Sequence, residues 1–63
     1  MLEQSMLRDQ IQALLDAERQ AQESYSQLSQ ELPAGEWKEK ICHLARDKQR
    51  HIALIERLLE ILD

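Results

Sequence analysis

Two histidines and an aspartate follow one another at intervals of four residues in the second half of the chain. His43, Asp47 and His51 read His-x3-Asp-x3-His, a spacing that places all three side chains on one face of a helix. Imidazole and carboxylate groups in this arrangement are suited to binding a transition metal. The same stripe is also common on solvated helices, so the pattern leaves both a metal site and a solvated charged face open.

The elements that carry these residues are predicted to be helices. Valine, threonine, phenylalanine and asparagine are absent, and isoleucine is the only β-branched residue, so strand-forming residues are scarce. The only proline and the only glycine, Pro33 and Gly35, stand together in "ELPAGEW" and punctuate the chain. We therefore predict one all-α domain over 1–63, with helices at about 3–31 and 36–62 and a turn at 32–35.

Apolar residues recur in both halves at alternating intervals of three and four, which is typical of a heptad seam. The expected seam residues are Leu7, Ile11, Leu14, Glu18, Ala21, Tyr25, Leu28 and Leu32, followed by Trp37, Ile41, Leu44, Lys48, His51, Ile55, Leu58 and Leu62. Flanking apolar residues widen this stripe beyond what one neighbouring helix covers, namely Leu15, Ala45, Ile52 and Leu59. A chain this short seldom buries enough surface to be stable alone. We expect an antiparallel helical hairpin that forms a homodimer, an antiparallel four-helix bundle.

Three polar residues interrupt the apolar seam: Glu18, Lys48 and His51. If the turn centres near Ala34, Glu18 lies opposite the segment 48–51, so all three interruptions fall in one layer of the hairpin. Independent substitutions would scatter along the helices. The pattern therefore predicts a polar layer in the core, formed by Glu18, Lys48 and His51.

The residues around this layer resemble the ferritin-like superfamily, in particular its rubrerythrin-type branch. In that family a helix with Glu-x2-Ala-x3-Tyr packs beside one with Ala, then Glu-x2-His, then a leucine-rich run. This chain has Glu18, Ala21 and Tyr25 in the first register, and Ala45, His51 and "LIERLLEIL" in the second. The resemblance implies half of a four-helix bundle, in which two hairpins together bind a pair of iron atoms.

One residue departs from the family motif. The resemblance places a bridging glutamate at position 48, where this chain has Lys48. A lysine within a few ångströms of a metal dication costs several kcal/mol even at an effective dielectric near 20. We therefore expect no cofactor and a metal-free layer in which Lys48 neutralises Glu18 and His51 bonds to either. The alternative is an iron or zinc protein that uses Glu18 and His51 from both subunits, with Asp47 standing in for the lost glutamate.

Three further residues are expected to have structural roles. Trp37 is predicted to cap the core at the turn end, and Tyr25 to lie in the core with its hydroxyl directed at a partner. Cys42 is expected to fill space as a small apolar side chain, because a single cysteine forms no intrachain disulfide.

Charge and composition narrow the class of function. The net charge is −4, yet Arg46, Arg50 and Arg57 lie roughly along one helix face, so an RNA-binding two-helix dimer is kept as a less favoured alternative. No glycine-rich phosphate loop or nucleophile elbow is present, so the sequence favours a structural or interaction module over an enzyme. No apolar run is long enough for a membrane span and no signal-peptide pattern is present, so we expect a cytoplasmic protein without a membrane partner.

Overall fold

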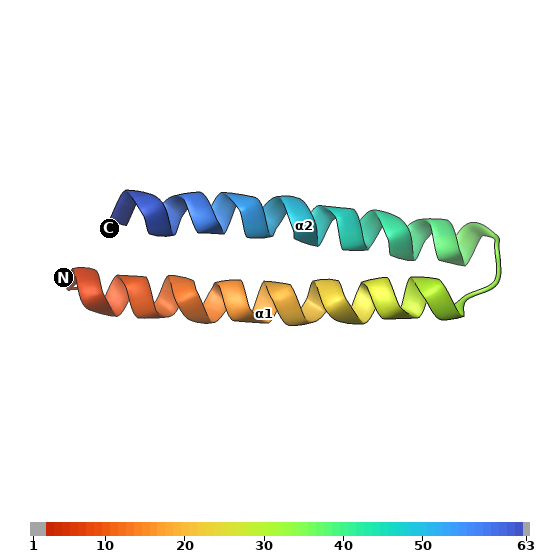
Figure 1. The fold of residues 1–63 in the computed structure, drawn as a ribbon, viewed down its shortest axis with the longest axis horizontal. Coiled ribbons are helices and arrows are strands. Elements are labelled where there is room, and N and C mark those ends of the chain that lie inside the picture. The colour runs from red at the N-terminus through yellow and green to blue at the C-terminus, as the bar shows by residue number, and fades with distance from the viewer. Residues whose placement is uncertain (1–2, 63) are drawn as a thin grey trace.

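The computed structural model describes residues 3–62, so residues 1, 2 and 63 of the expected domain lie outside the described residues. Within that range the chain forms α1 (Gln4–Glu31) and α2 (Glu36–Leu62), which pack side by side in opposite directions (Figure 1). The hairpin measures 48 Å along its length and 16 by 14 Å across. The prediction of an all-α helical hairpin is confirmed.

The turn between the helices follows from Pro33 and Gly35. Leu32 precedes the proline and is extended (φ −80°, ψ 142°), as steric contact with a proline ring favours, and its N–H donates to the Leu28 carbonyl at 3.1 Å. Gly35 has φ +154°, a conformation that residues with a side chain rarely adopt. Its carbonyl accepts the Glu39 N–H at 3.1 Å and begins α2. Both interactions stop one helix and start the next within four residues.

At the other end of the hairpin the two helix termini lie side by side (Figure 1). The Gln4 side-chain amide donates to the Leu62 carbonyl, and the Arg8 guanidinium donates to the same oxygen at 3.3 Å. The last carbonyls of a helix have no partner within the helix, so donors from α1 satisfy one of them here. These contacts join the start of α1 to the end of α2.

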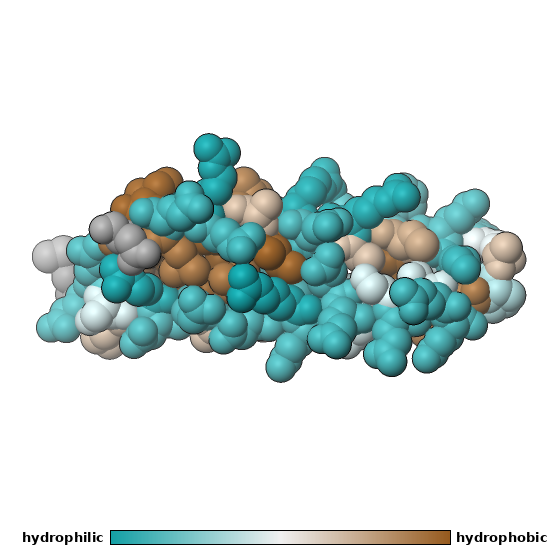
Figure 2. Space-filling model, in the orientation of Figure 1, coloured by the Kyte–Doolittle hydropathy of each residue, from teal (hydrophilic) through white to brown (hydrophobic). Residues whose placement is uncertain are grey.

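The contact between α1 and α2 buries few residues completely. Among residues 3–62, the buried hydrophobic residues are Leu15 (2% exposed) and Ile55 (7% exposed). The rest of the contact is half-buried and includes Ile11, Tyr25, Ile41, Ala45, Ile52 and Leu59. On the face shown in Figure 2, hydrophobic residues gather between the helices toward the end that holds the chain termini, with hydrophilic residues around them.

The expected seam differs from the observed contact at Leu14 and Leu28 in α1 and at every second position in α2. Leu14, Leu28, Leu44 and Leu58 were expected to face the other helix of the hairpin, but they are 50%, 41%, 40% and 49% exposed. The flanking residues Leu15, Ala45, Ile52 and Leu59 occupy the contact instead. The apolar stripe is wider than one helix-helix contact, so the two helices pack through one edge of it and leave the other edge uncovered.

Neither helix within residues 3–62 has an apolar stretch long enough to cross a membrane.

Candidate functional site

The structure brings Glu18, Lys48 and His51 together halfway along the hairpin. Lys48 Nζ lies 3.3 Å from Glu18 Oε1 and 3.2 Å from Glu18 Oε2, so the ammonium group contacts both carboxylate oxygens. His51 Nδ1 lies 3.4 Å from Oε2 and can donate to it when that nitrogen carries the proton. One side chain of α1 therefore accepts hydrogen bonds from two side chains of α2, one helical turn apart. We call these three residues the polar layer.

The members of the polar layer differ in exposure. The side chains of Glu18 and Lys48 are 16% and 26% exposed, whereas that of His51 is 53% exposed. Glu18 and Lys48 thus lie between the helices, and His51 lies at the edge of the contact with half of its surface free. Within one hairpin the layer is partly covered, and the uncovered part belongs mainly to His51.

The polar layer changes the acidity of Glu18. Partial burial by itself raises the pKa of this carboxyl, because it disfavours the charged form. The hydrogen bonds from Lys48 and His51, together with their positive charges, act in the opposite direction and hold the pKa of Glu18 below its ordinary value. Glu18 is therefore a carboxylate at neutral pH, and its negative charge is balanced within the hairpin by Lys48.

The His43, Asp47 and His51 stripe does not converge on one point. Asp47 forms an ion pair with Arg50, three residues further along α2, and His51 contacts Glu18. No group of three or more histidine, cysteine, aspartate or glutamate side chains is arranged to hold a metal ion among residues 3–62. The pairing of Asp47 with Arg50 was missed from sequence, although a spacing of three along a helix is a recognised signal for such a pair.

Trp37 does not cap the core as the sequence suggested. Its side chain is 73% exposed, and the Lys40 ammonium lies 5.3 Å from the centre of its ring, in the range of a cation–π contact. Tyr25 is half-buried, and Cys42 is a half-buried free thiol. Trp37 points away from the contact with α1, because α2 turns the next position, Lys38, and Ile41 toward that contact instead.

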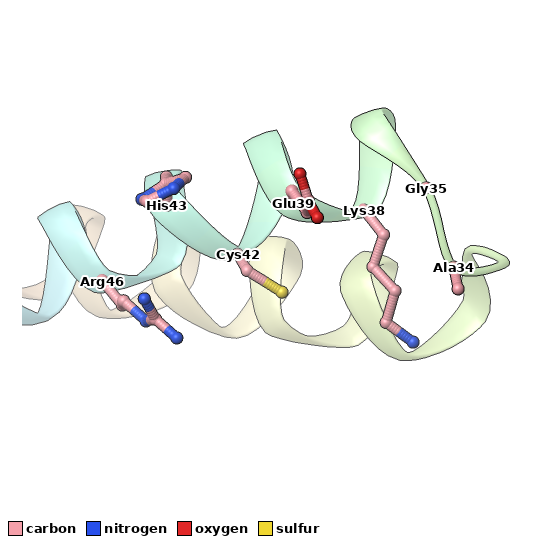
Figure 3. A pocket seen from close by; sticks show the side chains of 7 residues that line it. All are labelled: Ala34, Gly35, Lys38, Glu39, Cys42, His43 and Arg46. Atoms are coloured by element: carbon pink, nitrogen blue, oxygen red, sulfur yellow. The ribbon is translucent and has the colours of Figure 1, made fainter.

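A shallow hollow of about 350 Å³ lies beside the turn, on the first turns of α2. Figure 3 shows Lys38, Cys42 and Arg46 along it, with the Lys38 side chain extending from α2 across toward α1. Glu39 and His43 also line it. The hollow is open to solvent and is formed by one helix and the turn, so its side chains do not surround a ligand from opposite sides.

The leucines left out of the contact lie together on one broad face of the hairpin. Along a helix, steps of +3 and −4 from a contact residue turn about 40–60° in one direction, and a step of +1 turns about 100° in the other. In α1, Leu14 is four residues before Glu18 and Ala21 is three residues after it. In α2, His51 is four residues before Ile55 and Leu58 is three residues after it, so all four are rotated from the contact in the same direction. Two antiparallel helices are related by a two-fold axis perpendicular to their common plane, so these positions fall on the same side of the pair.

We call this side the open face. It consists of Leu14, Ala21, Leu28, Trp37, Leu44, His51 and Leu58. The opposite broad face carries the residues one step after the contact positions, among them Arg19 and Glu56, which form an exposed ion pair between the helices at 3.2 Å. The hairpin thus has one broad face crossed by an ion pair and one face on which exposed leucines flank His51.

No family model, no curated protein and no solved structure matches the chain. The polar layer and the open face are the features of the described residues that bear on function.

Proposed function

We propose that the protein is a helical-hairpin interaction module that pairs with a second copy of itself into a four-helix bundle. The observation that carries the proposal is the open face. Leu14, Leu28, Leu44 and Leu58 are each 40–50% exposed, lie on the same side of the molecule and are spaced by two heptads within each helix. Scattered exposed leucines need no explanation, whereas several exposed leucines gathered on one face are typical of a protein-protein contact.

The surface area of the hairpin supports the same proposal. A folded monomer of this mass exposes about 4,200 Å² by the usual scaling of surface with mass. The hairpin exposes 5121 Å². The excess of about 900 Å² is similar to the roughly 800 Å² that each partner buries in a standard interface. Covering the open face with a second hairpin would remove about this excess.

The polar layer has a defined role in such a bundle. Glu18, Lys48 and His51 lie midway along the hairpin, with leucines of the open face on both sides. A shift of one hairpin relative to the other by a heptad would press this layer against apolar side chains and leave charges without partners. We propose that the layer fixes the register, as single polar residues do in coiled coils.

The resemblance to ferritin-like hairpins remains part of the proposal. Glu18 and His51 match the family's ligand positions and touch each other, as ligands of one site would. Lys48 occupies the position of the bridging glutamate and binds Glu18 instead of a metal. We propose that the layer is a di-iron-type site in which an ion pair has replaced the metal.

The oligomeric state tests the proposed function. Sedimentation equilibrium should give twice the 7.4 kDa mass of the chain. Leu14→Glu should shift the protein toward monomer, because it places a charge in the centre of the open face. Gln49→Glu is the control: Gln49 is exposed and stands one step after the contact residue Lys48, on the opposite broad face, so it should leave the dimer intact. A wild-type monomer at micromolar concentration, or equal effects of the two variants, would contradict the proposal.

The competing function is a working metal protein, and the contact between Glu18 and His51 is what favours it. In that case one iron or zinc ion would be bound by these two residues from both subunits. Metal analysis of protein purified without an affinity tag separates the two proposals. Stoichiometric iron or zinc that disappears in His51→Gln supports the metal protein, and protein free of both metals supports the interaction module.

A further inference from the structure

The charges of the polar layer favour one orientation of two hairpins in a dimer. This inference rests on the proposed dimer. Two hairpins whose open faces meet have two symmetric arrangements. With the two-fold axis along the bundle, both turns lie at the same end and α1 of one copy packs on α2 of the other. With the axis across the bundle, the turns lie at opposite ends and α1 packs on α1. Both arrangements place neighbouring helices antiparallel, so helix dipoles do not choose between them.

The charges of the polar layer do choose between them. Glu18 lies near the middle of α1, and Lys48 and His51 lie on either side of the middle of α2. When the turns are apart and the hairpins overlap fully, Glu18 faces the Glu18 of the second copy, and Lys48 faces Lys48. When the turns are together, Glu18 of each copy faces Lys48 and His51 of the other. Like charges next to each other in a partly dry contact are unfavourable, and opposite charges are favourable.

A shift along the bundle does not rescue the first arrangement. Moving one hairpin by a heptad to separate the two Glu18 side chains displaces it by about 10 Å. That is a sizeable part of the 48 Å length, and it sets the polar layer of each copy against the apolar layer of Ile11 or Tyr25. Overlap is lost and the charges lose their partners. Only the arrangement with the turns together keeps full overlap and pairs opposite charges.

The exposure of His51 agrees with a site that is completed by the second copy. Its side chain is 53% exposed on the open face, while Glu18, which it contacts, is 16% exposed. In the arrangement with the turns together, the free side of this imidazole meets the Glu18 of the other hairpin. We infer that the protein dimerises with both turns at the same end, and that each Glu18 is shared by Lys48 and His51 of both copies.

A charge reversal that keeps the ion pair within each hairpin tests this inference. The double variant Glu18→Lys/Lys48→Glu is mixed with wild-type protein, one of them isotope-labelled, and the mixture is unfolded, refolded and examined by native mass spectrometry. With the turns together, a mixed dimer places carboxylate on carboxylate and ammonium on ammonium, so mixed dimers should fall well below the statistical half. With the turns apart, mixed dimers gain opposite charges and should exceed half. A mixed fraction of half or more overturns the inference.

The opposite broad face supplies the matched control. Arg19→Glu/Glu56→Arg reverses an ion pair of the same length that lies away from the open face, so its mixed dimers with wild type should reach the statistical half.

A spin-label measurement gives the answer if the charge-reversed variant does not fold. A nitroxide on Ala34→Cys, in a Cys42→Ser background, reports the distance between the two turns of the dimer. A distance well under half of the 48 Å hairpin length supports the inference, and a distance close to that length overturns it. Gln20→Cys, near the middle of α1, should give a similar distance in both arrangements and shows that a dimer is present. If the wild-type chain sediments as a monomer, the proposed function fails and the orientation with it.

Discussion

Glu18 and Lys48 lie 30 residues apart in the chain, yet the lysine ammonium contacts both oxygens of the glutamate carboxylate, at 3.3 and 3.2 Å. The antiparallel turn of the hairpin brings them together, and they form an ion pair between α1 and α2 in the middle of the helix contact. The exposed pair of Arg19 and Glu56 is a useful contrast, because its side chains are 50% and 49% exposed. The inner pair is shielded from water and the outer pair is not, so the two should behave differently.

The Glu18–Lys48 pair should be strongly coupled in stability measurements. Lys48→Met removes the main donor of a shielded carboxylate, so it should lower the free energy of unfolding more than the double variant Glu18→Leu/Lys48→Met, which removes both charges. Urea unfolding of the four proteins of this cycle measures the coupling. The same cycle on Arg19 and Glu56 should give a coupling of at most about 1 kcal/mol. Equal and small couplings in both cycles would place the polar layer at the solvated surface.

The lowered pKa of Glu18 makes part of the stability depend on pH. Because the folded-state pKa is below the ordinary value of 4.5, the unfolded state binds a proton more readily than the folded state. The contribution of Glu18 is therefore complete above that ordinary value and is lost as the pH falls through the lower folded-state pKa. Unfolding of wild type and Glu18→Gln should show a stability difference that is constant at neutral pH and shrinks below pH 4.5. A difference that stays constant in acid would contradict the ion pair.

Much of the fold could be predicted from the sequence, because its signals are local. Pro33 and Gly35 mark the turn, and the seam periodicity marks two helices. What could not be predicted is which edge of the apolar stripe faces the other helix. Leu14 and Leu15 both fit the pattern, and the structure buries Leu15 while leaving Leu14 50% exposed. An apolar stripe wide enough to contact two neighbouring helices does not predict which edge packs against the other helix of the same chain.

Leu15 should be the residue whose truncation costs most in the contact between the helices. Leu15→Ala leaves a cavity at the most buried point and should lower the free energy of unfolding by about 2–5 kcal/mol. Leu54→Ala is the control, because Leu54 is 61% exposed, and it should change stability by about 0.5 kcal/mol or less. Chemical denaturation at a fixed protein concentration measures both. A larger effect at Leu54 than at Leu15 would be incompatible with this packing.

Gly35 should be sensitive for a reason that concerns the backbone alone. A methyl group added there meets nothing within 4 Å, but φ is +154°, which residues with a side chain rarely adopt. Gly35→Ala should therefore lower the free energy of unfolding by about 1–3 kcal/mol. Ala34, the neighbouring exposed residue, has an ordinary φ, so Ala34→Ser should change the free energy of unfolding by about 0.5 kcal/mol or less. Thermal unfolding of both variants measures these changes. If the stability of Gly35→Ala equals that of the wild type, the turn adopts another conformation.

The polar layer was the part of the candidate site that sequence reasoning could locate, because its members interrupt an otherwise apolar pattern. Trp37 shows the limit of that reasoning. An aromatic residue at a seam position was expected in the core, but it is 73% exposed, since α2 turns a neighbouring position toward α1. A rotation of less than one residue step decides whether a side chain is inside or outside, and periodicity does not resolve so small an angle.

The descent of the layer from a metal site can be tested at Lys48. Lys48→Glu removes a cation that contacts Glu18 and restores the carboxylate that ferritin-like hairpins carry at this position. In a dimer this variant offers four carboxylates and two imidazoles, so calorimetric titration with ferrous iron under anaerobic conditions should show tighter binding than in the wild type. Lys48→Gln removes the same charge without adding a ligand of the same strength, and it should bind far more weakly. No gain in Lys48→Glu, with the dimer intact by sedimentation, would count against that ancestry and leave the ion pair as a purely structural device.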